Sequence, residues 1–244
     1  MSISKQKKGF VFNKDHILQK WIEKETKIAL CLCLNTKRIL CIKYRGSIAM
    51  NRGKRIVNKT KLATKKALLE LIREKNYPDI TVSEITKRGN VGRSTLYKHY
   101  RSKADVLVDI HRDIFEHLFK EMSTSKAWLA PEPPLELVLF FKRYRNVGRN
   151  PFSLSYKLGG DLDYLISHIN RELTATVLER LRSAYNDGDY SIPLALLAKS
   201  ISNLYGGLIM AWFTEFQSFE IQQFARNMHR MIRALIFEAI GNES

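Results

Sequence analysis

The sequence predicts an all-α protein in which a small N-terminal helical module precedes a larger helical body. From Thr60 onward, apolar residues recur at the spacing of amphipathic helices. Residues 124–240 contain no stretch in which apolar and polar residues alternate, so no strand is expected there. The length of 244 residues suits one small domain joined to a larger one.

The composition excludes several classes of protein. Apolar residues make up 45% of the chain and charged residues 27%, which is typical of a globular protein and not of a disordered one. The longest uninterrupted apolar run, residues 28–34, is far too short to cross a membrane. No apolar segment of a signal peptide follows the first lysines. We therefore expect a cytoplasmic protein with no membrane partner.

The three cysteines, Cys31, Cys33 and Cys41, all lie near the N-terminus. Their spacing matches no zinc motif, and no cluster of histidines accompanies them. An odd number of cysteines without a secretion signal is typical of reduced thiols. The sequence therefore predicts neither a metal site nor a cofactor.

Positive charge is concentrated in the N-terminal half. The chain carries a net charge of +17, and residues 50–103 hold 15 Lys and Arg against 4 Asp and Glu. Residues 104–244 hold 15 against 17, so the basic character ends near residue 103. A basic module on a near-neutral body indicates a polyanion-binding unit. The alternative is a solvated basic face without a partner.

Residues 1–57 show no clean amphipathic pattern and are predicted to form a poorly ordered basic extension. A chain that starts at Met50 would open with a short basic arm, so we expect residues 1–49 to be absent from the working protein or loosely attached. The alternative is a subdomain in which apolar residues of this segment pack on the body. Its candidates are Trp21, Ile22, Leu32, Leu34 and Ile39–Ile42.

Residues 58–118 are predicted to form the N-terminal module. The expected helices are 60–75, 82–88, 93–100 and 103–121. Their expected N-caps are Thr60, Thr81, Gly92 and Ser102. Glu84 follows Thr81 by three residues, which completes a capping box. Gly89 and Asn90 supply a tight turn between the second and third helices, because Asn tolerates the left-handed conformation.

Two short helices joined by a turn of three to four residues are typical of DNA readers. In such a pair the first helix supports the second, whose N-terminal residues enter the major groove. In the expected second helix, Arg93, Ser94, Thr95, Lys98 and His99 are polar, whereas Leu96 and Tyr97 are expected to face inward or toward the backbone. Lys103 could hold a phosphate beside the start of the next helix.

Residues 81–103 resemble the helix-turn-helix of TetR/AcrR-type transcriptional regulators. The matching positions are Val82, Ile85, Val91, Thr95, Leu96, Tyr97, His99, Tyr100 and Lys103. The sequence departs from the family pattern at Thr86, Asn90 and Gly92, and the aromatic position 100 holds Tyr in place of the usual Phe. Asn in a left-handed turn and Gly at an N-cap are both tolerated, so the motif remains intact.

The resemblance implies a three-helix DNA-binding head and a helical body that binds a ligand and dimerises. It implies that Thr81 and residues 97–99 touch phosphates or base edges, and that Lys103 clamps the DNA backbone. Together with the polar residues of the expected recognition helix, the candidate DNA-binding set within and after residues 81–100 is Thr81, Arg93, Ser94, Thr95, Tyr97, Lys98, His99, Tyr100 and Lys103.

Residues 119–244 are predicted to form the helical body. Proline, glycine and turn residues separate its expected helices, which are 135–145, 161–185, 191–216 and 221–240. Asp161 and Ser191 are expected to begin two of these helices, and Gly241 to end the last one.

The last two helices resemble the dimer-forming pair of the family. The candidate interface residues are Gly206, Phe224, Met228, Ile232 and Leu235. The alternative is that these apolar stripes pack inside one chain. The resemblance also implies that some aromatic residues line a pocket for a small apolar or aromatic effector. The candidates are Phe140, Tyr144, Tyr156, Tyr205 and Trp212. The alternative is that they form ordinary core, which is the commoner role of aromatics at helical spacing.

No catalytic motif is present: the sequence lacks a nucleophile elbow, a phosphate-binding glycine loop and a zinc-protease motif. We therefore predict that the protein is not an enzyme. The expected function is a sequence-specific transcriptional regulator, a homodimeric repressor that a small ligand releases from a double-stranded DNA operator. It would be cytoplasmic and nucleoid-associated. The alternative is a helical adaptor that acts through protein contacts of its body and retains a vestigial DNA head.

Overall fold

A computed structural model describes residues 52–144, 159–186, 189–216 and 218–240 of the chain. Every regular element in these ranges is helical, which confirms the predicted all-α class. The expectations for residues 1–49 fall outside the described residues. In the described residues, no helix is long and apolar enough to cross a membrane.

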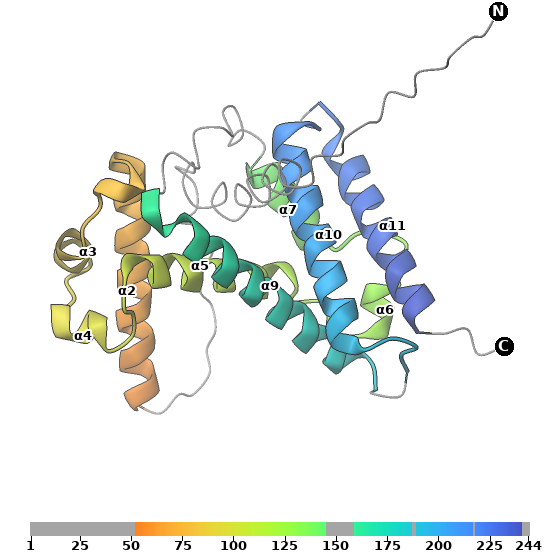
Figure 1. Ribbon diagram of the computed structural model, residues 1–244, viewed down its shortest axis with the longest axis horizontal. Coiled ribbons are helices and arrows are strands. Elements are labelled where there is room, and N and C mark those ends of the chain that lie inside the picture. Colours follow the sequence, from red (N-terminus) through yellow and green to blue (C-terminus); the bar gives the residue numbers. More distant parts are fainter. Residues whose placement is uncertain (1–51, 145–158, 187–188, 217, 241–244) are drawn as a thin grey trace, which may run out of the picture.

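The head consists of three helices at one end of the molecule (Figure 1). They are α2 (Arg52–Glu74), α3 (Val82–Gly89) and α4 (Arg93–Tyr97), and a short 3-10 helix η2 (Tyr77–Asp79) joins the first two. α2 packs against both α3 and α4. α5 (Lys103–Leu118) then leads from the head into the body and also packs on α2.

The predicted start of the first helix at Thr60 is wrong, because α2 begins at Arg52. Thr60 lies inside the helix, where its carbonyl oxygen accepts a hydrogen bond from the Thr64 hydroxyl at 2.9 Å. Several good helix formers in residues 52–59 allow the extra turns despite Gly53.

The other head helices begin at the predicted caps. Thr81 and Glu84 form the reciprocal capping box of α3. Asn90 ends α3 in the left-handed conformation with φ of 49°, and Gly92 is the N-cap of α4. Ser102 caps α5 in a second reciprocal box with Asp105, which the sequence analysis did not identify. Local side-chain hydrogen bonds therefore determine where α3 and α5 start, whereas the Gly92 cap of α4 makes none.

The body lies at the other end and contains α6 (Ser125–Trp128), α7 (Leu135–Tyr144), α9 (Leu162–Ala184), α10 (Leu194–Thr214) and α11 (Ile221–Ala239), with the 3-10 helix η3 (Gly159–Asp161) before α9. α5 and α9 run side by side along the middle of the molecule and join the two ends (Figure 1). α10 packs against both α9 and α11.

Two predicted caps in the body differ in the structure, and one cap was not predicted. Asp161 occupies the N-cap position of α9, but its side chain makes no capping hydrogen bond. Ser191 does not cap α10, because its hydroxyl and N–H both donate to the Ala239 carbonyl at the end of α11. Glu220, which the sequence analysis missed, caps α11 through hydrogen bonds from two backbone N–H groups. Asp161 and Ser191 do not cap their own helices because their side chains bond to other elements of the protein.

One apolar core extends from the head into the body. Its largest fully buried side chains are aromatic and lie in both parts: Trp128, Trp212, Tyr77, Tyr205, Phe119 and Phe141. Burial of apolar area is the main favourable term in folding, so this shared core couples the orientation of the head to the body.

Candidate DNA-binding site

The outer side of α4 presents polar and aromatic side chains to solvent. Arg93, Ser94, Tyr97 and Lys98 are exposed, and Tyr97 retains 46% of its accessible surface. Thr95 and His99 are half-buried. The opposite side is anchored by Leu96, which is 1% exposed. An exposed aromatic side chain among cations suits contact with a nucleic acid backbone and base edges.

α3 holds α4 in place because α3 packs closely on α2. A Cβ added at Gly89 would lie 3.2 Å from the Ala63 carbonyl oxygen and 3.3 Å from the Ala67 Cβ, so glycine permits this close approach. Ile85, which is 1% exposed, buries the inner face of α3. The left-handed Asn90 then turns the chain toward α4. Thr81, at the start of α3, is exposed but uses its hydroxyl in the capping box.

Several head cations are used in ion pairs within the protein. Arg88 donates two hydrogen bonds of 2.7 Å to the Glu74 carboxylate. Lys75 donates to Glu84 at 2.5 Å, and this hydrogen bond together with those from Thr81 lowers the pKa of Glu84 to about 2. Among the described residues, several exposed cations of the head have no such carboxylate partner; they include Lys87, Arg93, Lys98 and Arg101. These are the positive charges available to a polyanion.

Lys103 does not present its ammonium group as the resemblance implied. Its Nζ donates to the carbonyl oxygens of Tyr77 at 2.9 Å, Pro78 at 2.9 Å and Ile80 at 3.0 Å. It also lies 4.5 Å from the Tyr77 ring centroid. An ammonium has three N–H donors, and three carbonyls accept them. Burial lowers the pKa of Lys103, although the ammonium remains the form that the carbonyls require. We therefore remove Lys103 from the candidate DNA contacts.

Tyr100 is also wrongly placed among the DNA contacts. Its side chain is 4% exposed, and its hydroxyl donates to Asp109 Oδ2 at 2.7 Å. Burial and the neighbouring Asp109 carboxylate raise the pKa of Tyr100. The family pattern has an aromatic residue at this position, which is equally compatible with core packing. Sequence alone could not distinguish these roles, because the buried partner lies nine residues away on the next helix.

Three of the predicted effector-pocket residues belong to the apolar core. Phe140, Tyr205 and Trp212 are buried at 7%, 1% and 0% exposure and pack as core. The Trp212 ring lies 5.2 Å from that of Phe141. Tyr156 and the side chain of Tyr144 lie outside the described residues.

A surface pocket of about 470 Å³ lies elsewhere, between the loop after α6 and the outer side of α11. Its lining residues are Leu129, Arg230, Arg233, Ala234 and Phe237. None of them was predicted to contact a ligand. The helical spacing of the four α11 residues could have indicated a shared face, but not that Leu129 approaches it.

The predicted dimer stripe is mostly buried inside the chain. Met228 and Ile232 are both 0% exposed, and Phe224 packs its ring 5.3 Å from that of Phe141. Gly206 is buried as well. Of the predicted interface residues only Leu235 is exposed, at 39%. The other four are buried within the chain: three lie on the face that α11 turns toward α7 and α10, and Gly206 lies within α10.

Within the part of the chain that the structure describes, no cluster of three or more His, Cys, Asp or Glu side chains could hold a metal ion. The outer face of α4 presents hydrogen-bond donors, cations and one exposed aromatic ring. These groups suit non-covalent recognition of a polyanion.

Comparison with known proteins identifies the relatives of the head. Residues 66–110 match the family model described as bacterial regulatory proteins, tetR family. An uncharacterised HTH-type transcriptional regulator of Bacillus subtilis (strain 168), YxbF, is 38% identical over 69 residues. That match covers 26% of this chain and 18% of the relative, so the chain matches less than a fifth of that protein's length.

Solved structures also show similarity over most of the chain. A TetR transcriptional regulator from Streptococcus agalactiae 2603V is 26% identical with a TM-score of 0.41, and the match covers 74% of this chain and 97% of that one. FadR of Thermus thermophilus, a TetR-family repressor solved with lauroyl-CoA, is 18% identical with a TM-score of 0.46. That match covers 75% of this chain and 97% of FadR.

Proposed function

We propose that the chain is a sequence-specific transcriptional regulator of the tetR family of bacterial regulatory proteins, whose family model matches residues 66–110. The single observation that carries this proposal is the outer face of α4. It exposes Arg93, Ser94, Tyr97 and Lys98 on a head that also exposes Lys87 and Arg101. This arrangement supplies groups for both base edges and phosphates.

In the proposed complex, α4 enters the major groove and α3 crosses the DNA backbone. Arg93, Ser94 and Thr95 at the start of α4 are the candidates for base contacts, because recognition helices read with their N-terminal residues. Tyr97, Lys98 and His99 are the candidates for phosphate contacts. Thr81 at the start of α3 is a further candidate for the backbone.

We further propose a homodimer that places two heads on one operator. Its interface would use the exposed side of α10 and α11 rather than the buried stripe. Lys199, Asn203 and Gly207 follow at four-residue steps on exposed positions of α10. A Cβ at Gly207 would meet nothing within 4 Å, which leaves room for a partner helix. Met231 and Leu235 supply exposed apolar area on α11.

A small apolar or aromatic effector that releases the operator completes the proposal. Its support is the aromatic cluster of Phe141, Trp212 and Phe224 in the body, where ring centroids lie 4.9–5.3 Å apart and could rearrange around a flat ligand. Such an effector must bind more tightly to the state that cannot bind DNA than to the state that can. For a typical coupling, the two binding free energies differ by about 1–3 kcal/mol. A thermal-shift screen followed by a test of operator release identifies it.

Selection of binding sites from random DNA duplexes tests the regulator proposal directly. The full chain should enrich one sequence, and a dimer should enrich an inverted repeat of it. A helical adaptor with a vestigial head would enrich no sequence, and that result would overturn the proposal. A regulator of this kind acts on chromosomal DNA, so the proposal places the protein in the cytoplasm with the nucleoid.

A further inference from the structure

The recognition helix is connected to the body by an unbroken series of polar contacts. The Tyr100 hydroxyl, just after α4, donates to Asp109 Oδ2 on α5 at 2.7 Å. Arg112, also on α5, donates from Nη1 to Asp109 Oδ1 at 2.8 Å. The Nε of Arg112 donates to Glu172 Oε2 on α9 at 2.7 Å. We call these four side chains, Tyr100, Asp109, Arg112 and Glu172, the head–body relay.

Asp109 is the centre of the relay. It is 7% exposed, and its Oδ2 also lies 3.1 Å from the ammonium of Lys65 on α2. Burial alone would raise the pKa of Asp109, but the Tyr100 hydroxyl and the Lys65 ammonium outweigh burial and lower it. Asp109 is therefore a buried carboxylate whose three donors come from three parts of the protein. Removing a partner from a buried charge costs considerable free energy, so these side chains resist displacement from one another.

Tyr100 carries this constraint to α4. Its backbone N–H donates to the Leu96 carbonyl at 3.0 Å, which joins it to the last turn of the recognition helix. α4 spans only Arg93–Tyr97, and so short a helix has little stability of its own. Its orientation therefore depends on contacts with the rest of the protein, which are the burial of Leu96 and, just after the C-terminal end, the side chain of Tyr100.

Two further contacts bring the same side of α9 to the head. The Tyr164 hydroxyl donates to Asp105, whose other oxygen accepts a 2.7 Å hydrogen bond from the N–H of Arg101, directly after Tyr100. Asp161, just before α9, accepts a 2.9 Å hydrogen bond from the Tyr77 hydroxyl. Asp161, Tyr164 and Glu172 are spaced by three and eight residues, which places them along one face.

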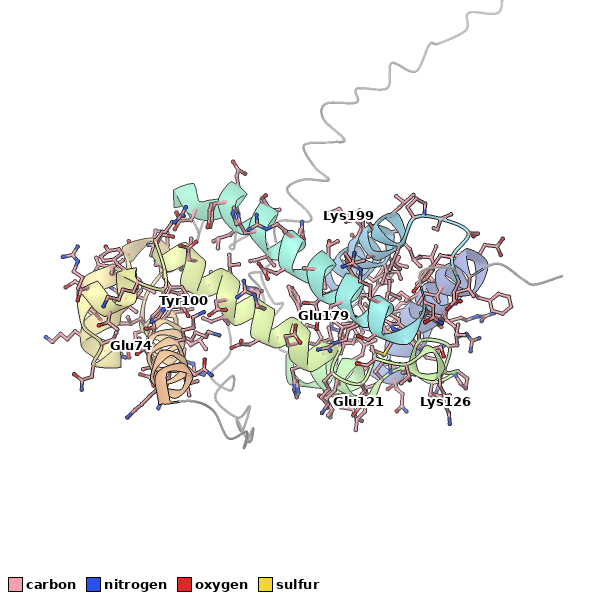
Figure 2. All side chains as sticks on the ribbon, turned by 90° about the horizontal axis from the view of Figure 1, so that it is seen from below. Glu74, Tyr100, Glu121, Lys126, Glu179 and Lys199 are labelled. Atoms are coloured by element: carbon pink, nitrogen blue, oxygen red, sulfur yellow. The ribbon has the colours of Figure 1, made fainter. Side chains whose placement is uncertain are left out.

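We propose that Asp109, Arg112 and Glu172 are positioning residues that hold the recognition helix in its DNA-reading orientation. α9 would thereby set the affinity for the operator without touching DNA. This inference rests on the proposed function, and it assigns to a body helix a direct role in specificity. Figure 2 labels Tyr100 in the head and, in the body, Glu179, which lies beyond Glu172 on α9.

The test compares three full-length variants with the wild type. Tyr100→Phe removes only the hydroxyl, and Glu172→Gln removes the carboxylate that Arg112 pairs with. Glu179→Gln is the matched control, because Glu179 is an exposed residue of the same helix whose side chain has no ion-pair partner among the described residues. Affinity is measured for the selected operator and for a random duplex, and amide hydrogen exchange is measured without DNA.

Tyr100→Phe and Glu172→Gln should each weaken operator binding about tenfold, the size expected for a hydrogen bond to a charged group. Binding to the random duplex and its salt dependence should stay unchanged, because no phosphate contact is lost. The double variant should lose scarcely more than either single one, since both interrupt one relay. Amide exchange in residues 93–100 should be faster in both single variants and unchanged in Glu179→Gln.

The readouts separate failure of the inference from failure of the proposed function. If the wild type selects no operator, the proposed function fails, but the amide-exchange comparison still decides whether the relay holds α4. Operator affinity equal to that of the wild type in Tyr100→Phe and Glu172→Gln would overturn the relay. Losses that add up in the double variant would overturn it too, because independent sites are additive.

Discussion

Individual side chains of the head have roles that their residue types alone do not reveal. Lys103 and Lys98 are both lysines beside the recognition helix, yet the first binds three carbonyl oxygens and the second is exposed. Tyr100 and Tyr97 differ in the same way, since one is buried against Asp109 and the other is 46% exposed. Orientation decides which of each pair can meet DNA.

Replacing Lys103 should affect stability rather than charge recognition. Lys103→Met should lower the free energy of unfolding by about 1–3 kcal/mol, because three carbonyls lose a charged donor. The salt dependence of DNA binding should not change. Lys98→Met should leave the free energy of unfolding unchanged. It should instead lower the slope of log binding constant against log salt concentration by about one. Urea unfolding and DNA titrations at several salt concentrations check both. An equal fall in salt slope for the two variants would show that Lys103 does contact a phosphate.

His111 should make stability depend on pH. The side chain is fully buried, and its Nδ1 donates to the Leu107 carbonyl at 2.8 Å. Burial lowers its pKa to about 4, from 6.5. The unfolded chain therefore binds more protons than the folded one between these pH values, so stability falls as the pH falls through this window.

The loss due to His111 should reach about 3 kcal/mol between pH 6.5 and 4, because each unit of pKa shift corresponds to about 1.4 kcal/mol. Burial lowers the pKa of His229 also, so it contributes in the same direction. Unfolding free energies of the wild type and His111→Gln at pH 5 and 7 measure the difference. A wild-type slope equal to that of the variant would contradict the prediction.

At the scale of single elements, capping and turn residues fix the helices of the head. The Thr81–Glu84 box begins α3, and Asn90 at φ of 49° ends it. The left-handed conformation costs an L-residue with a Cβ roughly 1–2 kcal/mol, a cost that Asn tolerates better than most residues because its short polar side chain can hydrogen-bond locally. The turn from α3 to α4 therefore depends on the residue at this position.

Asn90→Ala should destabilise the protein by about 1 kcal/mol, whereas Asn90→Gly should remain within about 0.5 kcal/mol of the wild type. At a positive φ the Cβ of alanine causes a steric clash, whereas glycine has no Cβ. Thermal unfolding of both variants gives the comparison, and operator affinity should fall with alanine because α4 follows this turn directly. Equal destabilisation by the two residues would mean that the Asn90 side chain, and not its backbone conformation, stabilises the turn.

At the scale of the whole molecule, α11 has two sides with different roles. Met228 and Ile232 face the core at 0% exposure, whereas Met231 and Leu235 remain exposed. A charge on the first pair would be buried without a partner, which costs several kcal/mol. A charge on the second pair would interfere only with association.

Leu235→Lys should therefore give a folded monomer with an unchanged melting temperature, and it should bind an inverted-repeat operator weakly. Ile232→Lys should unfold the chain instead. Light scattering and circular dichroism distinguish these results. A folded Leu235→Lys variant that keeps the wild-type mass would place the dimer interface on another surface.

The sequence by itself determined the helical class and most head boundaries. The boundaries depend on helical periodicity and on the cap and turn residues Thr81, Asn90, Gly92 and Ser102. These act through contacts a few residues apart, so they can be recognised in the sequence. Periodicity also located the apolar stripe of α11, and an apolar stripe must be buried against some partner.

Only the tertiary structure decided what each stripe and each polar side chain meets. Lys103 reaches carbonyls more than twenty residues earlier, and Tyr100 reaches Asp109 on the next helix. The partner of Arg112 lies sixty residues later on α9. Whether Met228 faces its own chain or a second copy is likewise a matter of packing, because the periodicity is the same in both cases. Contacts between residues far apart in sequence depend on how the helices pack, and no local pattern encodes that arrangement.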